Sequence, residues 1–332
     1  MNSMGKVAVI GGGSWATALA KLLLRNNERI AWYIRKPERI EYFIKYRHNP
    51  VYLSDVSFDI SRIDFYSDIN AACMDADTLV VAIPSPYLID EVSKITVDIS
   101  AKNIVSAVKG IVPGHNMIVS DFFSTHFGCG RDNQLVIGGP CHAEEVALER
   151  LSYLTIGCSD LEKGGDFAAL LAAKNLKTIL SEDVAGIEYS AVLKNVYAIA
   201  GGIISGMKAG DNFMAMMASN AVREMRSFID AVVPMPRDIC LSAYLGDLLV
   251  TAYSRFSRNH NFGSMIGKGY SVKAAKMEME MVAEGYYGTK CIHEINSSTV
   301  KVSMPILDCV YQILYEGVSA RKAIPKITDS FC

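Results

Sequence analysis

The sequence lacks the patterns that are typical of disulfide frameworks, zinc sites and membrane spans. Its eight cysteines include no Cys-x-x-Cys pair, and its six histidines form no His-x-x-x-His pair. This predicts free thiols in a reducing compartment and no bound metal. The longest uncharged apolar run, residues 195–207, is too short and too rich in glycine to cross a bilayer, so we expect a buried helix there.

The sequence also has no excess of charge of either sign. A net charge of −2 gives no electrostatic reason to expect nucleic acid or an anionic membrane surface as a partner. With 50% hydrophobic and 20% charged residues, the chain has the composition of a well-packed soluble enzyme, and 332 residues can form two domains. The scattered cysteines make the cytoplasm the expected location. Because a strand is expected within a few residues of Met1, we expect no cleaved signal peptide.

A glycine-rich turn near the N-terminus is the most informative stretch. Residues 6–19 read KVAVIGGGSWATAL, an apolar run of strand type, three glycines and a segment of helical spacing that begins at Ser14 and Trp15. Gly11 and Gly13 allow a tight turn and a close approach of the backbone to a diphosphate, while a helix N-terminus offers N–H groups and the positive end of its dipole. This order predicts a dinucleotide site, with a purely structural turn as the other interpretation.

Two basic residues stand where a dinucleotide-binding fold meets the adenosine ribose. Residues 29–34 are a second strand candidate, and Arg35 and Lys36 follow them about twenty residues after the glycines. An NAD-specific site has an acidic residue there for the 2′-hydroxyl, whereas Arg35 and Lys36 suit a 2′-phosphate. The pattern therefore favours NADPH over NADH, unless the two side chains are solvated charges at a strand end.

The first half of the chain alternates apolar runs with short helical segments, which predicts a doubly wound α/β domain with a parallel sheet. Strands are expected at residues 6–10, 29–34, 77–83, 103–108, 134–139, 153–158 and 176–180, a helix at 37–47 and an irregular segment at 50–61. Ligands of such sheets lie beyond the carboxyl ends of the strands. That rule groups Gly13, Arg35, Pro84, Lys109 and Gly139 around one crevice.

Long segments of helical period replace the strands from about Val184. We therefore predict a dinucleotide-binding Rossmann-type domain over residues 1–185 and an all-helical substrate-binding domain over residues 186–332. No Gly/Ser-rich linker separates the two, so we expect a continuous helix to join them.

Two apolar helical segments of the second half each contain a single charge. Lys194 is the only charged residue in 191–207, and Asp247 is the only one in 239–254. An unpaired buried charge is strongly destabilising, so the two are candidates to pair with each other. Small residues such as Gly201 on the face of Lys194 are expected to leave room for a ligand beside the amine. A purely structural ion pair is the alternative.

The helix around Asp247 carries further polar residues at helical spacing. If it continues, Thr251, Ser254 and Arg258 lie on the same side, with Asn259 adjacent. Arg258 is then the natural phosphate ligand, because its planar fork can bind phosphate in a bidentate manner. An ordinary surface arginine is the other interpretation.

A dinucleotide site combined with a buried lysine indicates carbonyl reduction. Hydride added to a ketone carbon leaves negative charge on the oxygen, which a positioned ammonium can protonate. Lys194 is the candidate general acid, with Lys109 as a second cation and Asp247 as a counter-charge. Lys109 is expected to lower the pKa of Lys194 and Asp247 to raise it, and which effect is larger is left open.

An ordered set of short motifs extends over nearly the whole chain. These are GGGSWATALA at 11–20, VKG at 108–110, GP at 139–140, LKNVYAIAGGI at 193–203, GDLLVT at 246–251, SRN at 257–259 and VAEGYY at 282–287. In this set the chain resembles the NAD(P)-dependent glycerol-3-phosphate dehydrogenases, especially the bacterial type. The resemblance implies a Rossmann-type and an all-helical domain, and interconversion of dihydroxyacetone phosphate and sn-glycerol 3-phosphate for phospholipid synthesis. It also implies NADPH or NADH as cofactor, and a homodimer.

Carried onto matching positions, the resemblance makes Lys194 the proton donor and acceptor, with Lys109 and Asp247 beside the substrate. It adds substrate contacts at Gly139, Ser257, Arg258 and Asn259, and cofactor contacts at Ser14, Trp15, Arg35, Ala143, Arg258, Val282 and Glu284. The candidate site is completed by Gly11, Gly13, Lys36, Pro84 and Lys109 for the cofactor and by Cys141 and Thr251 for the substrate.

One position departs from the family pattern. After Gly-Pro the family usually has Ser or Thr, then Phe and Ala, where this chain has Cys141, His142 and Ala143. A thiol is a poorer hydrogen-bond donor than a hydroxyl, which leaves the role of residue 141 open. His142 is interpreted as a replacement for a packing aromatic rather than as an extra polar contact.

Two other functions stay open. A β-hydroxyacid or 6-phosphogluconate-type dehydrogenase also pairs a Rossmann-type domain with a helical one and uses a lysine, but the SRN triplet and the Lys109 and Lys194 pair favour the phosphotriose. A redox sensor that holds NADPH without turnover needs no buried acid–base pair, so Lys194 and Asp247 count against it.

Overall fold

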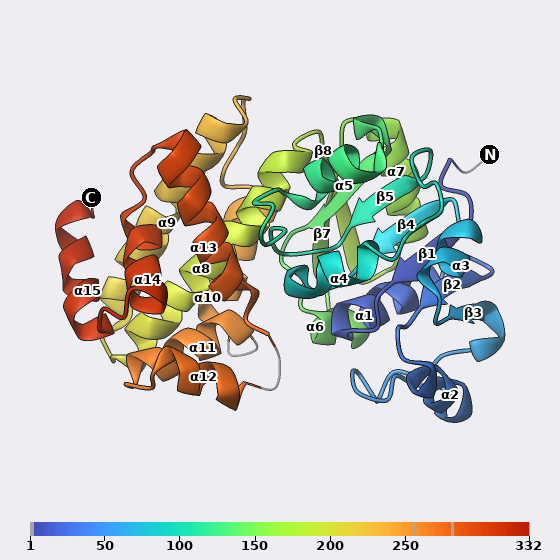
Figure 1. The fold of residues 1–332 in the computed structure, drawn as a ribbon, viewed down its shortest axis with the longest axis horizontal. Coiled ribbons are helices and arrows are strands. Elements are labelled where there is room, and N and C mark those ends of the chain that lie inside the picture. The colour runs from blue at the N-terminus through green and yellow to red at the C-terminus, as the bar shows by residue number, and fades with distance from the viewer. Residues whose placement is uncertain (1–2, 255–256, 280–281, 332) are drawn as a thin grey trace. The chain divides into compact units, whose positions relative to one another are not determined.

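The computed structural model describes residues 3–254, 257–279 and 282–331. The chain divides into two compact units (Figure 1). The first comprises Met1–Val108 and Val119–Val184, and the second comprises Lys109–Ile118 and Ala185–Cys332. The short segment that begins at Lys109 therefore belongs with the helical unit, although in sequence it follows the part of the chain that forms the sheet.

The first unit is built on one sheet, which has eight strands within the described residues. These are β1 (Val7–Ile10), β2 (Ile30–Tyr33), β3 (Ile63–Tyr66), β4 (Thr78–Val81), β5 (Asn103–Ser106), β6 (Gln134–Gly138), β7 (Ser152–Cys158) and β8 (Leu176–Ser181). Their order is β3-β2-β1-β4-β5-β6-β7-β8, and all neighbours are parallel except the antiparallel pair β6 and β7. This is the strand order of a dinucleotide-binding fold. The predicted α/β class is confirmed, and each predicted strand is present.

Short helices connect the strands of the first unit (Figure 1). They are α1 (Ser14–Leu23), α2 (Pro37–Tyr46), α3 (Ile69–Met74), α4 (Leu88–Val92), α5 (Val119–Phe127), α6 (Ala143–Ala147) and α7 (Leu161–Leu170), with 3-10 turns η1 (Ile60–Arg62), η2 (Ser85–Tyr87) and η3 (Arg131–Asn133). Strand β3 and helix α3 were not expected from the sequence. Strand β3 lies at the edge of the sheet and buries only Ile63 fully, so it lacks the continuous apolar run that identified the central strands.

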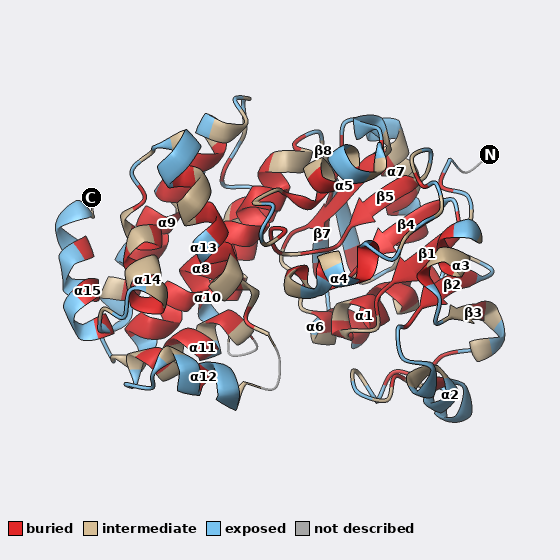
Figure 2. Ribbon diagram, in the orientation of Figure 1, coloured by how far each residue is buried: buried red, intermediate tan, exposed pale blue. Residues whose placement is uncertain are grey.

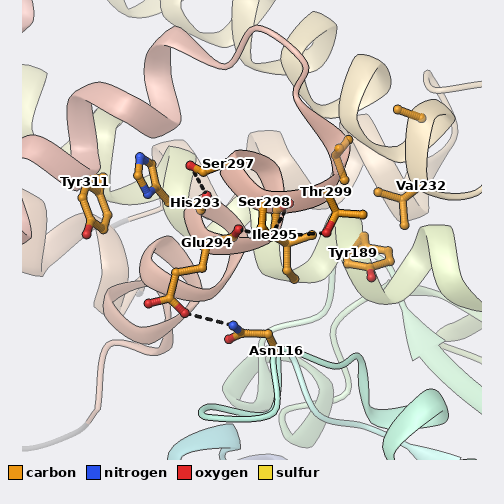
Figure 3. A pocket seen from close by; sticks show the side chains of 12 residues that line it. Asn116, Tyr189, Val232, His293, Glu294, Ile295, Ser297, Ser298, Thr299 and Tyr311 are labelled. Atoms are coloured by element: carbon orange, nitrogen blue, oxygen red, sulfur yellow. Dashed lines mark hydrogen bonds between the residues drawn. The ribbon is translucent and has the colours of Figure 1, made fainter.

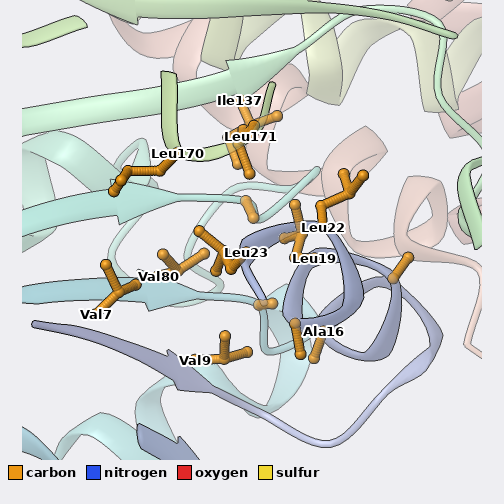
Figure 4. Close-up of a cluster of buried hydrophobic side chains, with 14 of the residues drawn as sticks. Val7, Val9, Ala16, Leu19, Leu22, Leu23, Val80, Ile137, Leu170 and Leu171 are labelled. Carbon is orange, nitrogen blue, oxygen red and sulfur yellow. The ribbon is translucent and has the colours of Figure 1, made fainter. Parts of the chain in front are cut away.

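The core of the first unit forms where α1 packs on the sheet (Figure 4). Leu19, Leu22 and Leu23 of α1 are buried in one cluster with Val9 of β1 and Val80 of β4. Because α1 begins directly after the glycine turn, this packing fixes the direction in which the helix N-terminus points.

The second unit is helical. Its elements are α8 (Val184–Gly206), α9 (Asp211–Val232), the π-helical turn η4 (Ser242–Gly246), α10 (Asp247–Tyr253), α11 (Arg258–Gly267), α12 (Val272–Glu278), α13 (Glu284–Ile295), the π-helical turn η5 (Asn296–Val300), α14 (Pro305–Tyr315), α15 (Ala320–Ile327) and the 3-10 turn η6 (Thr328–Ser330). Helix α8 is buried along most of its length, as predicted for residues 195–207 (Figure 2). Among the described residues, none of the helices combines the length and the apolar character that a membrane crossing requires.

The helix that begins at Asp247 does not continue to Arg258. Helix α10 ends at Tyr253, Ser254 has an extended backbone, and a separate helix, α11, begins at Arg258. Residues 255–256 lie outside the described residues. The expectation that Asp247, Ser254 and Arg258 share one side of a continuous helix is therefore wrong, because the helical backbone stops at Tyr253.

Candidate active site

The glycine turn between β1 and α1 has the geometry of an anion site. Gly11 has a φ of 132°, and a Cβ there would lie 2.6 Å from the carbonyl oxygen of Ala82, so the position requires glycine. Around Gly13, no described atom beyond its chain neighbours lies within 4 Å of a Cβ position, which leaves open space. Ser14 and Trp15 are the first residues of α1, whose first turn contains no acidic residue. The turn therefore fits the diphosphate of a dinucleotide.

Arg35 lies at the end of β2 beside a carboxylate that the sequence analysis missed. Its Nη1 donates to Glu91 Oε1 over 3.0 Å, while 56% of the side chain is exposed. Glu91 on α4 is 5% exposed and also accepts from the Tyr33 hydroxyl (2.6 Å) and from Lys94 Nζ (2.9 Å). Burial acts to raise the pKa of Glu91, but these donors together lower it, so the carboxylate stays ionised. Lys36 is the exposed N-cap of α2.

The turn after β6 is closed by a glycine and a thiol. Gly139 has a φ of 98°, and a Cβ there would lie 2.9 Å from the carbonyl oxygen of Tyr153 on β7. The buried thiol of Cys141 donates to the carbonyl oxygen of Gly139 over 3.1 Å. A thiol is a weaker donor than the hydroxyl that the family usually has here, and this bond is local, between residues two positions apart. Ala143 is the first residue of α6, and Pro84 is the N-cap of η2 after β4.

In the second unit the two lone charges form an ion pair. Lys194 Nζ on α8 lies 2.5 Å from Oδ1 of Asp247, the first residue of α10, and the two side chains are 4% and 2% exposed. The predicted pairing of these charges is confirmed. A buried ammonium that is compensated by a carboxylate can supply a proton to a substrate oxygen.

Lys109 is tied to the same helix through its backbone. Its carbonyl oxygen accepts a 2.7 Å hydrogen bond from Nδ2 of Asn195, the residue after Lys194. This bond attaches the backbone of Lys109 to α8 at the position next to Lys194. Asn195 was not among the predicted site residues, although a polar amide within an apolar helical run is a recognisable signal.

Several polar residues after Asp247 bond to the helices themselves. Thr251 Oγ1 donates to the carbonyl oxygen of Asp247 over 2.6 Å, one turn earlier in α10. Ser257 Oγ is the N-cap of α11 and accepts from the N–H of His260. Arg258 is the first residue of α11 and comes directly after the N-cap residue, Ser257.

The remaining predicted contacts lie at the N-terminus of α13. Glu284 is its first residue, and Val282 lies two residues before it. Oδ1 of Asn259 accepts from the N–H of Gly285 over 2.9 Å, and a Cβ on Gly285 would lie 2.6 Å from the carbonyl oxygen of Asn195. Helix α13 therefore begins in contact with α11 and with α8, the helix that carries Lys194.

Gly201 does not leave room for a ligand. A Cβ there would lie 3.1 Å from the terminal methyl of Met214, 3.3 Å from that of Met217 and 3.4 Å from the carbonyl oxygen of Ala252. The expectation of open space is therefore wrong at Gly201, because two methionines of α9 and the backbone of α10 fill it.

A groove of about 960 Å³ lies elsewhere in the second unit, beside the end of α13 and the π-helical turn η5 (Figure 3). Its lining includes Asn116, Tyr189, His293, Glu294 and Tyr311, and none of the predicted site residues. No lysine or arginine is among the residues that line it. A site without these side chains is a poor match for a phosphate, so the groove is not a candidate for the phosphotriose.

Comparison with known proteins identifies the family. The N-terminal domain of NAD-dependent glycerol-3-phosphate dehydrogenases matches residues 6–163, and their C-terminal domain matches residues 183–325. The chain belongs to the NAD-dependent glycerol-3-phosphate dehydrogenase family. A glycerol-3-phosphate dehydrogenase (NAD(P)+) of Oceanobacillus iheyensis is 30% identical over 327 residues, which cover 98% of this chain and 94% of the relative. The corresponding protein of Prosthecochloris aestuarii is 32% identical over 320 residues, or 96% of each chain.

Solved structures of the glycerol-3-phosphate dehydrogenase family share the fold. The crystal structure of glycerol-3-phosphate dehydrogenase from Coxiella burnetii has a TM-score of 0.88 and 24% sequence identity, and covers 98% of this chain and 99% of that one. In the present chain, the first unit contains the glycine turn, and the second unit contains Lys109, Lys194 and Asp247.

Proposed function

We propose that the chain catalyses the reversible NAD(P)H-dependent reduction of dihydroxyacetone phosphate to sn-glycerol 3-phosphate, which supplies the backbone of glycerophospholipids. The observation that carries the proposal is the buried ion pair of Lys194 and Asp247, in a chain whose relatives are named glycerol-3-phosphate dehydrogenase (NAD(P)+). A binding protein or sensor has no need for a desolvated ammonium of this kind.

The reaction needs one hydride and one proton for each carbonyl group. Reduced nicotinamide supplies the hydride to the ketone carbon when it is bound. As negative charge develops on the carbonyl oxygen, Lys194 Nζ donates the proton, and in the reverse direction it takes the proton back from the hydroxyl. The carboxylate of Asp247 keeps the buried ammonium compensated. Lys109 adds a second positive charge near the substrate, and the Arg258 guanidinium binds its phosphate.

The proposed cofactor is NADPH, with NADH accepted as well. The glycine turn and the N-terminus of α1 suit the diphosphate of either dinucleotide. Arg35 is held by Glu91 through one nitrogen and is more than half exposed, so the rest of its planar fork can bind a 2′-phosphate. Lys36 adds a further exposed positive charge.

The other assignments follow the same division. Residues 1–185 are proposed to bind the cofactor through Gly11, Gly13, Ser14, Trp15, Arg35, Lys36, Pro84 and Ala143, together with Lys109, Arg258, Val282 and Glu284. Residues 186–332 are proposed to bind the substrate through Lys194, Asp247, Thr251, Ser257, Arg258 and Asn259, together with Lys109, Gly139 and Cys141. A homodimer in the cytoplasm, with no nucleic acid partner, is proposed from the resemblance and from the net charge of −2.

Purified protein tests the reaction directly. Oxidation of NADPH, and of NADH in parallel, is followed with dihydroxyacetone phosphate and with 3-oxo acids as substrates. We expect turnover with the phosphotriose and a lower KM for NADPH than for NADH. Turnover of a 3-oxo acid alone would instead favour a β-hydroxyacid dehydrogenase, and tight NADPH binding without any turnover would favour a sensor.

A further inference from the structure

Consecutive carbonyl groups of the glycine turn are held by side chains from distant parts of the chain. The indole Nε1–H of Trp32 on β2 donates to the carbonyl oxygen of Gly11 over 2.7 Å. Nδ2 of Asn49, in the loop after α2, donates to the carbonyl oxygen of Gly12 over 3.3 Å. Both donors act on the turn from the protein interior, because the Trp32 side chain is fully buried and Asn49 is 2% exposed.

The third carbonyl group, that of Gly13, is held by Thr17 of α1. The Thr17 hydroxyl donates to this oxygen over 2.9 Å, and its backbone N–H donates over 3.0 Å. Nδ2 of Asn49 in turn donates to the Thr17 hydroxyl oxygen over 2.8 Å, which leaves the hydroxyl hydrogen directed at Gly13. Asn49 therefore acts on two of the three carbonyl groups, once directly and once through Thr17.

The planarity of the peptide bond converts these carbonyl bonds into the direction of N–H groups. In a trans peptide the C=O of one residue points opposite to the N–H of the next. Holding the oxygens of Gly11, Gly12 and Gly13 inward therefore directs the N–H groups of Gly12, Gly13 and Ser14 outward. The N–H groups of Gly12 and Gly13 have no backbone acceptor among the described residues, and open space lies beside Gly13. The turn thus presents donors, and not carbonyl oxygens, to an incoming anion.

We propose that Trp32, Asn49 and Thr17 are positioning residues for the cofactor diphosphate, because they hold the glycine turn with its N–H groups directed outward. The inference rests on the proposed function, which requires a dinucleotide at this turn. Since NADPH and NADH have the same diphosphate, the three residues act equally on both cofactors. They take no part in hydride or proton transfer, so they act on binding and not on the chemical step.

Two substitutions separate this role from a general effect on folding. Trp32→Phe removes the indole donor and keeps an aromatic ring beside Phe43 and Phe58, which pack against Trp32. Asn49→Ala removes the amide that bonds to Gly12 and Thr17. If Asn49→Ala fails to fold, Thr17→Val takes its place, because valine keeps the branched shape and lacks the hydroxyl.

Asn70→Ala is the matched control for Asn49→Ala. The Asn70 side chain makes the same pattern of bonds in the same unit: Nδ2 donates to one carbonyl oxygen, that of Lys94, and Oδ1 accepts from the N–H groups of Thr96 and Val97. In Asn49, Oδ1 likewise accepts from the N–H groups of Val51 and Tyr52. Only Asn49 also contacts the glycine turn.

The measurement is the Kd of NADPH and of NADH for each purified variant, obtained by fluorescence titration, together with kcat at saturating cofactor. We expect Trp32→Phe and Asn49→Ala each to raise both Kd values by roughly 5- to 30-fold. The ratio of the two Kd values and kcat should stay within about twofold of the unchanged protein. Asn70→Ala should leave both Kd values unchanged.

The inference is overturned if the Trp32 and Asn49 variants bind both cofactors as tightly as the unchanged protein. A selective loss of NADPH binding, or a loss of equal size in Asn70→Ala, would also overturn it. If the unchanged protein binds neither cofactor, the proposed function itself fails, and this result is distinct from normal binding that the substitutions leave unaffected.

Discussion

Lys194 and Asp247 stabilise each other as a buried pair of opposite charges. Their side chains are 4% and 2% exposed, and their charged atoms lie 2.5 Å apart. Removing one partner of such a pair leaves an uncompensated buried charge, which typically destabilises a protein by about 3–5 kcal/mol. Substitutions here therefore affect stability as well as chemistry, and activity has to be compared per folded molecule.

Arg35→Asp is expected to change the cofactor preference. The substitution removes the cation for the 2′-phosphate and adds a carboxylate beside Glu91, which is already ionised. The KM for NADPH should rise by roughly 10- to 100-fold, which corresponds to a charge-assisted hydrogen bond, while the KM for NADH changes little. Steady-state kinetics with both cofactors measure the effect.

Arg29→Asp is the control for that substitution. Arg29 immediately precedes the first residue of β2, whereas Arg35 follows its last residues, so the same charge change is made at the opposite end of the strand. It should leave both KM values unchanged. If Arg35→Asp raised the KM for NADH as much as that for NADPH, the assignment of Arg35 to the 2′-phosphate would be wrong.

At the scale of single residues, the sequence predicts charges well and their uncharged or distant partners poorly. Lys194 and Asp247 were recognisable because each is the only charge in an apolar run. Glu91 was not recognisable, since its partner Arg35 lies 56 positions away in sequence. Asn195 stands out as an amide in an apolar run, but its partner, the Lys109 carbonyl group 86 positions away, could not be predicted. Only the folded chain brings those groups within hydrogen-bond distance.

Glycines let α8 and α11 cross with their backbones in close approach. A Cβ on Gly202 of α8 would lie 2.0 Å from the carbonyl oxygen of His260, and a Cβ on Gly263 of α11 would lie 2.1 Å from the carbonyl oxygen of Ile199. No side chain fits between the helices at these points. The glycine content that argued against a membrane span thus serves the packing of the helix that carries Lys194.

Gly202→Ala should destabilise the second unit. The new methyl group meets backbone atoms that cannot rotate away, so the helices must separate, at a cost of roughly 1–3 kcal/mol or more. Thermal unfolding should show a lower Tm. Gly165→Ala in α7 is the control, because its Cβ would lie 3.8 Å from the nearest side-chain atom. That variant should be as stable as the unchanged protein or slightly more stable, and a Tm for Gly202→Ala that matched it would contradict the close approach.

Glu224 of α9 provides the N-terminal cap of α14. Its two carboxylate oxygens accept from the N–H groups of Ile306 (2.8 Å) and Leu307 (3.0 Å). The side chain is buried, and burial raises the pKa of Glu224 to about 8, although the two backbone bonds act in the opposite direction. The carboxyl group therefore joins two helices in a protonation state that changes near neutral pH.

The pH dependence of stability tests this group. The pKa of Glu224 is about 4.5 in the unfolded chain and about 8 in the folded protein. The contribution of this group to the free energy of unfolding is therefore complete below pH 4.5 and is lost as the pH rises through 8. Glu224→Gln keeps one acceptor oxygen and loses the second backbone bond at every pH, but it does not titrate. Between pH 5 and pH 9 its free energy of unfolding should therefore fall by about 1–3 kcal/mol less than that of the unchanged protein. Denaturant unfolding at both pH values, with the exposed Glu278→Gln as control, makes the comparison. Parallel pH profiles for Glu224→Gln and the unchanged protein would refute the raised pKa.

At the scale of elements, buried strands were the most predictable features. A continuous apolar run such as β4 can only be a fully buried strand or helix, and its length decides between them. The edge strand β3 has no such run, and the end of α10 at Tyr253 has no glycine or proline to mark it. The space beside Gly201 was misjudged because the methionines that fill it belong to α9, a different helix.

At the scale of the whole molecule, the glycine turn belongs to the first unit and the buried Lys194 and Asp247 pair belongs to the second. The alternation of strands and helices predicted the first unit, and the change to helical period predicted the second. Sequence alone did not predict that Lys109–Ile118 belongs with the helical unit. This segment follows β5 in sequence, and its contacts with α8 and α13, such as those of Lys109 with Asn195 and of Asn116 with Glu294, form only on folding.

The central claim is that Lys194 is the proton donor for the reduction of dihydroxyacetone phosphate. The most direct test is kcat for this substrate with saturating NADPH in Lys194→Ala, beside the exposed control Lys268→Ala, with the Kd of NADPH measured for both. We expect kcat to fall by about 10²- to 10⁴-fold in Lys194→Ala. The Kd of NADPH and all constants of the control should stay near those of the unchanged protein. Folded Lys194→Ala protein that turns over dihydroxyacetone phosphate at the unchanged rate would contradict the account.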